Sequence, residues 1–134
     1  WKLNESIPKH IVNSLRELTG ILFNKKIAVL GTAFKSGSDD VRQSPAIKLI
    51  DILKSYHADV VVHDPHVKNT MTLNQVLESP DIVIIATNHK EFANISEKIN
   101  LSNCKIIYDV WGMFDVKDFP GKHYAKIGKN FQQS

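Results

Sequence analysis

The sequence predicts an α/β fold in which an open parallel sheet of about five strands carries helices on both faces. Three observations lead to this prediction. Short apolar segments alternate along the chain with segments whose apolar residues recur every three to four positions. The apolar segments are continuous, which is typical of strands that are buried on both faces. The stretches between them are long enough for parallel crossover connections.

The composition fits a single packed domain. The chain has 134 residues, of which 43% are hydrophobic and 23% charged, with six glycines and five prolines. These values exclude a disordered or low-complexity chain. No apolar run approaches the roughly 18 residues that span a membrane, and no signal-peptide pattern opens the chain. We therefore expect no contact with a membrane.

Charge and cysteine content bear on the binding partners and the cellular location of the protein. The 17 basic and 14 acidic residues give a net charge of +3, and the basic residues are spread along the chain, which argues against binding of nucleic acid. The single cysteine, Cys104, cannot form an internal disulfide. This favours a reducing, cytoplasmic location. Cys104 also lacks a neighbouring histidine or cation, so we expect an inert buried thiol.

The first predicted element is an amphipathic helix over residues 6–20. Its apolar residues recur at helical spacing at Ile7, Ile11, Leu15 and Leu18. Ser6 is expected to be the N-cap, and Gly20 is expected to end the helix.

A strand, helix, strand unit follows. Residues 26–31 form a short apolar run that ends at a glycine, which predicts a buried strand. After a polar loop over residues 35–43, Ser44 and Pro45 predict the start of a helix that continues to about residue 57. A second buried strand is predicted over residues 60–63.

The rest of the chain repeats this alternation. Helices are predicted over residues 72–78 and 91–99, and strands over residues 82–87, 105–110 and 123–127. In such a sheet, ligands bind beyond the carboxyl ends of the strands.

The loop after the first strand, residues 31–45, is the richest candidate site. Its glycine, its small residues and the helix that follows would bring backbone amides close to an anion, and Lys35 and Arg42 add positive charge. These features point to a phosphate or diphosphate. The glycine spacing matches neither the dinucleotide fingerprint nor a Walker loop, so a simple change of chain direction stays open as an alternative.

Other polar residues give weaker signals. Asp64 follows the second strand, where dinucleotide folds place an acid that binds ribose, but a turn formed by Asp64 and Pro65 is an equal alternative. His63, Asp64 and His66 lack a fixed ligand geometry, so no metal site is predicted. No catalytic residue is predicted either.

Four segments together carry a family resemblance. They are residues 26–46, with the motifs Ala33-Phe34-Lys35 and Asp39-Asp40-Val41-Arg42 and the helix start Ser44-Pro45-Ala46, and the segments 61–66, 84–92 and 106–109. They resemble the C-terminal UDP-binding domain of the UDP-glucose/GDP-mannose dehydrogenases. Residues 4–8 resemble the end of that family's central, dimer-forming region.

The resemblance implies a function and a division of the chain. In that family a nucleotide-sugar alcohol is oxidised twice by NAD, to the uronic acid, through a thioester on a catalytic cysteine. Residues 21–134 would be the UDP-sugar-binding domain, and residues 1–20 the end of the central region. The resemblance also implies polysaccharide biosynthesis, a homodimer at full length, and NAD-binding and central domains as partners within one chain. Their cysteine and glycine motifs do not occur here, so we expect this chain alone not to be catalytic.

The resemblance assigns roles to three residues and leaves one in doubt. Phe34 and Lys35 match substrate-binding positions, and Arg42 matches an arginine that reaches NAD. Trp111 stands where the family commonly has the arginine of an Asp-Gly-Arg motif, and an indole cannot form the two-pronged contact of a guanidinium with phosphate.

Two other classes of protein remain open as alternatives. A free-standing nucleotide-binding or regulatory module would have the same sheet without an attached enzyme. A response-regulator-like domain would need an acidic pair directly after the first strand, whereas Asp39 and Asp40 come later. The sequence does not decide whether the substrate carries glucose or N-acetylmannosamine, and residues 4–8 slightly favour the amino sugar.

Overall fold

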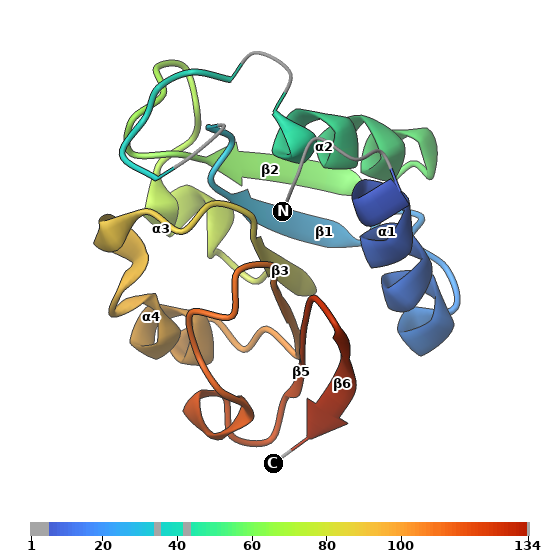
Figure 1. Cartoon of the computed structure of the whole chain (residues 1–134). Coiled ribbons are helices and arrows are strands. Elements are labelled where there is room, and N and C mark those ends of the chain that lie inside the picture. The colour runs from blue at the N-terminus through green and yellow to red at the C-terminus, as the bar shows by residue number, and fades with distance from the viewer. Residues whose placement is uncertain (1–5, 34–35, 42–43, 134) are drawn as a thin grey trace.

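The computed structural model describes residues 6–33, 36–41 and 44–133, which form one six-stranded sheet with helices on both sides (Figure 1). The strand order is β2-β1-β3-β4-β5-β6. The strands are β1 (Lys26–Leu30), β2 (Asp59–His63), β3 (Ile82–Ile85), β4 (Ile106–Asp109), β5 (His123–Lys126) and β6 (Lys129–Gln133). Neighbouring strands from β2 to β5 are parallel, and β6 is antiparallel to β5.

Two helices cover each face of the sheet. On one face lie α1 (Ser6–Thr19) and α2 (Pro45–Ser55), and on the other lie α3 (Leu73–Val76) and α4 (Ile95–Leu101) (Figure 1). Two 3-10 turns, η1 (Lys90–Phe92) and η2 (Val116–Asp118), precede α4 and β5. Of the helices in the described ranges, none is long and apolar enough to cross a membrane.

The sheet separates two hydrophobic clusters. In β1, Ile27 and Val29 belong to the cluster under α1 and α2, whereas Ala28 and Leu30 belong to the cluster under α3 and α4. All four side chains are fully buried. This confirms the prediction of a strand buried on both faces, with β1 inside the sheet between β2 and β3.

The predicted start of α2 is confirmed. The Ser44 hydroxyl accepts a hydrogen bond from the Ala46 amide at 3.1 Å, and Pro45 occupies the first helical position, where no amide donor is needed. The predicted end of α1 is confirmed as well, since Gly20 follows the helix with a φ of +85°. Ser6, the expected N-cap, is instead the first residue of α1.

The prediction of about five strands missed β6. This strand is mostly polar, so it has neither the continuous apolar run of a buried strand nor a clear alternation. It pairs with β5 through a tight turn at Ile127 and Gly128, where Gly128 has a φ of +82°.

The prediction that the second strand is buried was wrong. β2 lies at the edge of the sheet, and its residues from Val60 to His63 are only half-buried. An edge strand has one neighbour, so its apolar sequence alone could not reveal the exposure. The predicted helices over residues 72–78 and 91–99 are confirmed in position, but the first is the shorter α3 and the second is divided into η1 and α4.

Candidate functional site

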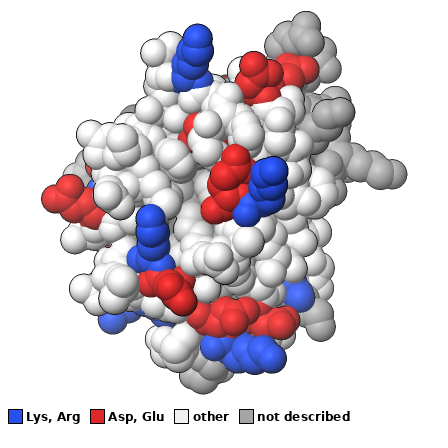
Figure 2. Space-filling model, turned by 90° about the vertical axis from the view of Figure 1, so that its left-hand side faces the viewer, with Lys and Arg blue, Asp and Glu red and all other residues white. Residues whose placement is uncertain are grey.

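The parallel strands bring four loops to one edge of the sheet. These loops follow Leu30, His63, Ile85 and Asp109. The edge is the left-hand side of Figure 1 and faces the viewer in Figure 2, where acidic and basic side chains are interspersed among uncharged atoms. Ligands of open α/β sheets bind at such an edge.

A buried carboxylate, Asp64, connects the ends of β1 and β2. Its side chain is fully buried. One oxygen, Oδ2, accepts hydrogen bonds from the amides of Thr32 at 2.7 Å and Ala33 at 3.1 Å, while Oδ1 accepts from the His66 amide at 2.8 Å. Burial by itself would raise the pKa of Asp64, but these amides and His89 lower it overall, below its usual value near 3.8. Asp64 is therefore a carboxylate at neutral pH.

His89, which is also fully buried, joins this carboxylate to the far end of the first loop. Its Nε2 lies 3.0 Å from Asp64 Oδ2, and its Nδ1 accepts a hydrogen bond from the Gly37 amide at 2.9 Å. Because an amide can only donate, Nδ1 carries no proton, and the neutral ring has its proton on Nε2, where it donates to Asp64.

Thr87 and Gly31 complete the attachment of the first loop. The Thr87 hydroxyl donates to the Ala33 carbonyl at 3.2 Å. Gly31 has a φ of +95°, and a Cβ at this position would lie 2.4 Å from the Cβ of Thr87. Only glycine permits both this backbone conformation and this close approach.

These contacts correct one expectation about the first loop. The sequence predicted that backbone amides of this loop approach an anion, but the amides of Thr32 and Ala33 donate to Asp64. A phosphate here would have to rely on other groups, because these amides are already occupied and Asp64 contributes negative charge beside them.

The three residues with predicted binding roles lie outside the described residues. They are Phe34, Lys35 and Arg42. The described residues on either side of Phe34 and Lys35 are held by other parts of the chain. Ala33 bonds to Asp64 and Thr87, and the Gly37 amide bonds to His89.

A second buried carboxylate, Asp109, organises the end of β4. Its Oδ2 accepts from the Phe114 amide at 2.9 Å and lies 2.7 Å from the Tyr124 hydroxyl. Its Oδ1 is buried and has no hydrogen-bond partner among the described residues. Burial first, and then the contact with Asp109, raises the pKa of Tyr124, so the phenol keeps its proton as a donor.

Trp111 lies at this edge with its polar group already used. The indole Nε1 donates to the Ala86 carbonyl at 3.2 Å, and the side chain is 39% exposed. Trp111 can therefore offer a ligand only its ring. Met113 and Phe114 pack against the cluster under α3 and α4.

His66, His89 and Glu91 place one possible ligand atom each within 4.8 Å of one another. His66 Nε2 lies 2.6 Å from the Glu91 carboxylate. Both nitrogens of His89 already make hydrogen bonds, to Asp64 and to Gly37, and a cation would have to break one of them. The arrangement does not fit a ready metal site.

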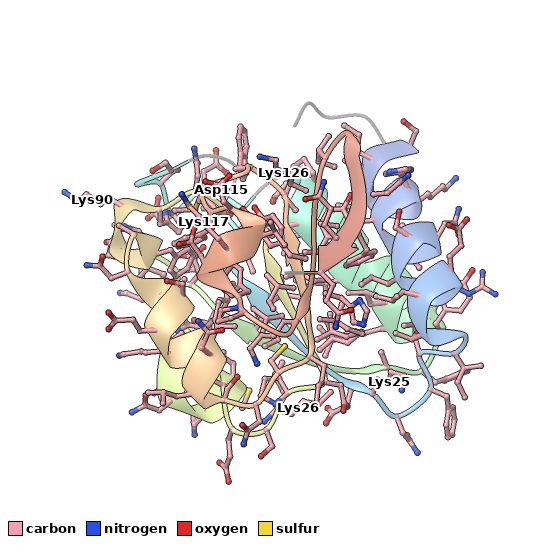
Figure 3. All side chains as sticks on the ribbon, turned by 90° about the horizontal axis from the view of Figure 1, so that it is seen from below. Lys25, Lys26, Lys90, Asp115, Lys117 and Lys126 are labelled. Carbon is pink, nitrogen blue, oxygen red and sulfur yellow. The ribbon has the colours of Figure 1, made fainter. Side chains whose placement is uncertain are left out.

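Several described lysines supply positive charge near this edge. Lys90 and Lys126 lie on the side where the strands end, and Lys25 and Lys26 lie at the opposite end of the sheet (Figure 3). Lys126 is the register partner of Asp109, and its side chain runs beside Gly112. The sequence alone does not indicate Lys126, since the pairing of β4 with β5 cannot be derived from spacing.

Cys104 lies away from this edge, directly before β4, and is fully buried. Burial raises the pKa of its thiol to about 11, so the thiolate that a nucleophile requires is scarce at neutral pH.

The fold and this edge together define the class of the domain. An open sheet with helices on both faces, whose first loop is fastened to the ends of β2 and β3, is a Rossmann-like domain of the kind that binds ligands beyond its strand ends.

Comparison with known proteins defines the family. Residues 28–116 match the model of the UDP-glucose/GDP-mannose dehydrogenase family, UDP binding domain, and the chain belongs to this family. It is 44% identical over 107 residues to a UDP-N-acetyl-D-mannosamine dehydrogenase of Pyrococcus horikoshii, covering 77% of this chain and 25% of that protein. It is 34% identical over 143 aligned positions to a UDP-glucose 6-dehydrogenase of Rickettsia felis, covering 92% and 32%.

A solved structure agrees with the fold. The NDP-N-acetyl-D-galactosaminuronic acid dehydrogenase from Methanosarcina mazei superposes with a TM-score of 0.83 at 26% identity, over 95% of this chain and 30% of that chain. The chain thus spans between a quarter and a third of the length of these relatives.

Proposed function

We propose that this chain is the UDP-sugar-binding domain of an NAD-dependent UDP-sugar 6-dehydrogenase, which oxidises a sugar alcohol to the uronic acid in two hydride transfers. The observation that carries the proposal is the family match over residues 28–116. That span contains the first loop and the residues Asp64, Thr87 and His89 that hold it. By itself the chain is expected to bind and not to catalyse.

The first loop is the proposed substrate site. Phe34 would lie by the nucleotide, with its backbone and ring in contact, and Lys35 would bring its ammonium to the phosphates or the sugar. The occupied amides of Thr32 and Ala33 support this role for Lys35, because they leave the charge of the diphosphate to side chains. Lys126, at the end of β5, is a described cation that could add to it.

NAD is proposed to be held mainly by another part of the full protein, with Arg42 reaching it from this domain. The acid that dinucleotide folds use for ribose is occupied here, since the buried Asp64 carboxylate takes part in five hydrogen bonds. The described residues therefore do not fit a complete NAD site of the usual kind.

The setting of the full protein is also a proposal. We place residues 1–20 at the end of a central region, residues 21–134 in the binding domain, and the whole enzyme as a cytoplasmic homodimer in polysaccharide biosynthesis. The sugar is proposed to be N-acetylmannosamine, which is supported by the name of the relative at 44% identity.

Calorimetric titration of this chain with UDP-glucose and with UDP-N-acetylmannosamine tests the proposal. Lys35→Ala should weaken binding by about tenfold or more, since a charge-assisted contact with phosphate is lost. Lys25→Ala is the matched control, because Lys25 lies at the opposite end of the sheet (Figure 3), and it should leave binding within about twofold.

The outcomes separate the substrate role from a merely structural loop. Absence of binding by the folded wild-type chain at millimolar ligand would overturn the proposed function. Equal losses in both lysine variants would remove Lys35 from the site.

A further inference from the structure

We propose that Trp111 is a ligand-contact residue whose indole stacks on a ring of the nucleotide sugar, with the Lys126 ammonium beside it for the charge of the diphosphate. The inference rests on the proposed function, because it names a contact for the same substrate. It depends on described residues at the ends of β3, β4 and β5 and on none of the three binding residues predicted in the first loop.

The first step is the place of Trp111 in the fold. It follows the last residue of β4 by two positions, at the edge where the parallel strands end and where ligands of open α/β sheets bind. β4 lies inside the sheet between β3 and β5, and it is parallel to both. A side chain at this end can therefore face a ligand that lies across several strand ends.

The second step is that the Trp111 ring is exposed and uncovered. In the described ranges, the exposed Phe, Tyr and Trp side chains are Phe23, Tyr56 and Trp111. The first two lie before β1 and β2, at the opposite edge of the sheet. There the His57 ring lies 6.3 Å from the Phe23 ring, and the Arg16 guanidinium lies 4.5 Å from the Tyr56 ring. Among the described residues, no ring and no cation makes a comparable contact with Trp111.

The third step is that this exposed ring is held in one place. The indole Nε1 donates to the Ala86 carbonyl, directly after β3, at 3.2 Å. The backbone that follows is fixed as well, since the Phe114 amide donates to Asp109 Oδ2 at 2.9 Å. A ring that is ordered before binding loses little conformational entropy when a ligand packs on it, and such aromatic anchors carry much of the affinity of binding sites.

The fourth step is a cation next to the ring. Gly112 follows Trp111, and the Lys126 side chain crosses it, with Cδ at 3.2 Å and Nζ at 3.9 Å from the place that a Cβ would take. Lys126 lies on the side where the strands end (Figure 3). A stacking surface beside an ammonium fits a ligand in which a flat ring is joined to a phosphate. A UDP-sugar has this chemistry twice, since the nucleoside and the hexose flank its diphosphate.

The alternative is a structural brace, in which Trp111 serves only to join the ends of β4 and β3 through its bond to Ala86. The two roles differ in what they predict. A brace needs the indole N–H, and its loss lowers stability. A ligand contact needs a flat ring, and its loss lowers affinity in a protein that stays folded.

Calorimetric titration of this chain with UDP-glucose separates these roles. Trp111→Leu keeps an apolar side chain without a flat ring and should weaken binding at least about fivefold. Trp111→Phe keeps a ring but cannot donate to Ala86, and should bind within about threefold of wild type. Phe23→Leu is the matched control, because it removes an exposed ring from the opposite edge, and it should stay within about twofold. Urea unfolding of each variant shows that it is folded.

A second titration, with UMP, identifies which ring is stacked. UMP carries the uracil without the hexose. Stacking on uracil predicts that Trp111→Leu weakens binding of UMP and of UDP-glucose by the same factor. Stacking on the hexose predicts that only UDP-glucose loses affinity. Either pattern supports the contact.

Fluorescence gives a readout that needs no substitution at Trp111, in case Trp111→Leu does not fold. The chain has two tryptophans, so Trp1→Phe leaves Trp111 as the only indole. Its emission should change on addition of UDP-glucose, along a saturable curve whose midpoint matches the calorimetric Kd. Unchanged emission at saturating ligand would overturn the contact.

The results also distinguish the contact from the proposed function. Wild-type affinity in Trp111→Leu, or equal losses in Trp111→Leu and Trp111→Phe, would overturn the contact and leave the proposed function standing. Absence of binding by the folded wild-type chain at millimolar UDP-glucose would overturn the proposed function, and the contact with it.

Discussion

Asp64 occupies the position from which dinucleotide folds bind a ribose, yet it faces into the protein. Its two oxygens are taken by three backbone amides and by His89. The same residue type at the end of a second strand thus serves to shape a neighbouring loop. Such an acid shapes the loop when the amides of the loop after β1 point toward it, and it is free to bind ribose when they do not.

Replacement of this carboxylate has a predictable cost. Asp64→Asn keeps one acceptor oxygen and places an NH2 group against the amides that the other oxygen satisfied, so the free energy of unfolding at pH 7 should fall by about 1–3 kcal/mol. Because the folded-state pKa of Asp64 lies below its usual value, its carboxylate stabilises the fold above that value, and this contribution is lost as the pH falls through the lowered pKa.

The difference between Asp64→Asn and wild type should therefore shrink on acidification below about pH 4. Urea unfolding at neutral and acid pH measures it. Asp59→Asn, an exposed carboxylate in β2, should change stability by less than about 0.5 kcal/mol. A difference between wild type and Asp64→Asn that is constant with pH would contradict the assignment.

Gly31 gives a second prediction at the scale of one residue. A Cβ at Gly31 meets Thr87 at 2.4 Å in a backbone conformation with φ of +95°, so Gly31→Ala should lower the free energy of unfolding by about 2–5 kcal/mol. Gly20→Ala has a similar φ of +85° and open space around the Cβ, and should cost only about 1 kcal/mol. Similar losses in the two variants, measured by urea unfolding, would show that the contact with Thr87 is unimportant.

At the scale of elements, local chemistry determined which predictions succeeded. Ser44 and Pro45 specify the start of α2 by themselves, since a hydroxyl acceptor and a residue without an amide suit the first turn of any helix. The exposure of β2 and the pairing of β6 depend on which strand lies next to which. No property of residues 60–63 or 129–133 alone contains that information.

The cap of α2 can be tested in isolation from the loop contacts. Ser44→Ala removes the acceptor of the Ala46 amide and should lower the free energy of unfolding by about 1 kcal/mol. Ser55→Ala, in the exposed last turn of the same helix, should change it by less than about 0.5 kcal/mol. Thermal or urea unfolding gives both values, and equal effects would argue against capping by Ser44.

For the whole molecule, Cys104 reports on opening of the sheet. The thiol lies in the cluster under α3 and α4, and with a pKa of about 11 only about one thiol in a thousand is ionised at pH 8. A disulfide reagent should label it at a rate that follows global unfolding and rises steeply with urea. Fast labelling of the native protein would show that β4 opens locally.

The sequence predicted the sheet and the loop at its edge, but only part of what holds that loop. Lys35 and Arg42 were candidates because cations beside a glycine turn have a recognisable chemistry. Asp64 was noticed as a possible ribose ligand and equally as part of a turn with Pro65, and the bond from the His66 amide to its Oδ1 agrees with the turn, whereas its contacts with Thr32 and Ala33 were not foreseen and His89 received no role. The hydrogen bond between Gly37 and His89 joins residues 52 positions apart, and it exists only once β1 and β3 lie side by side.

The attachment of the first loop has a consequence for protein engineering. A segment copied from residues 31–45 into another parallel α/β scaffold would carry its cations but not its shape, because the acceptors and donors that fold it come from positions 64, 87 and 89. A working transplant has to move those three side chains together with the segment, so the smallest portable unit extends across three strands.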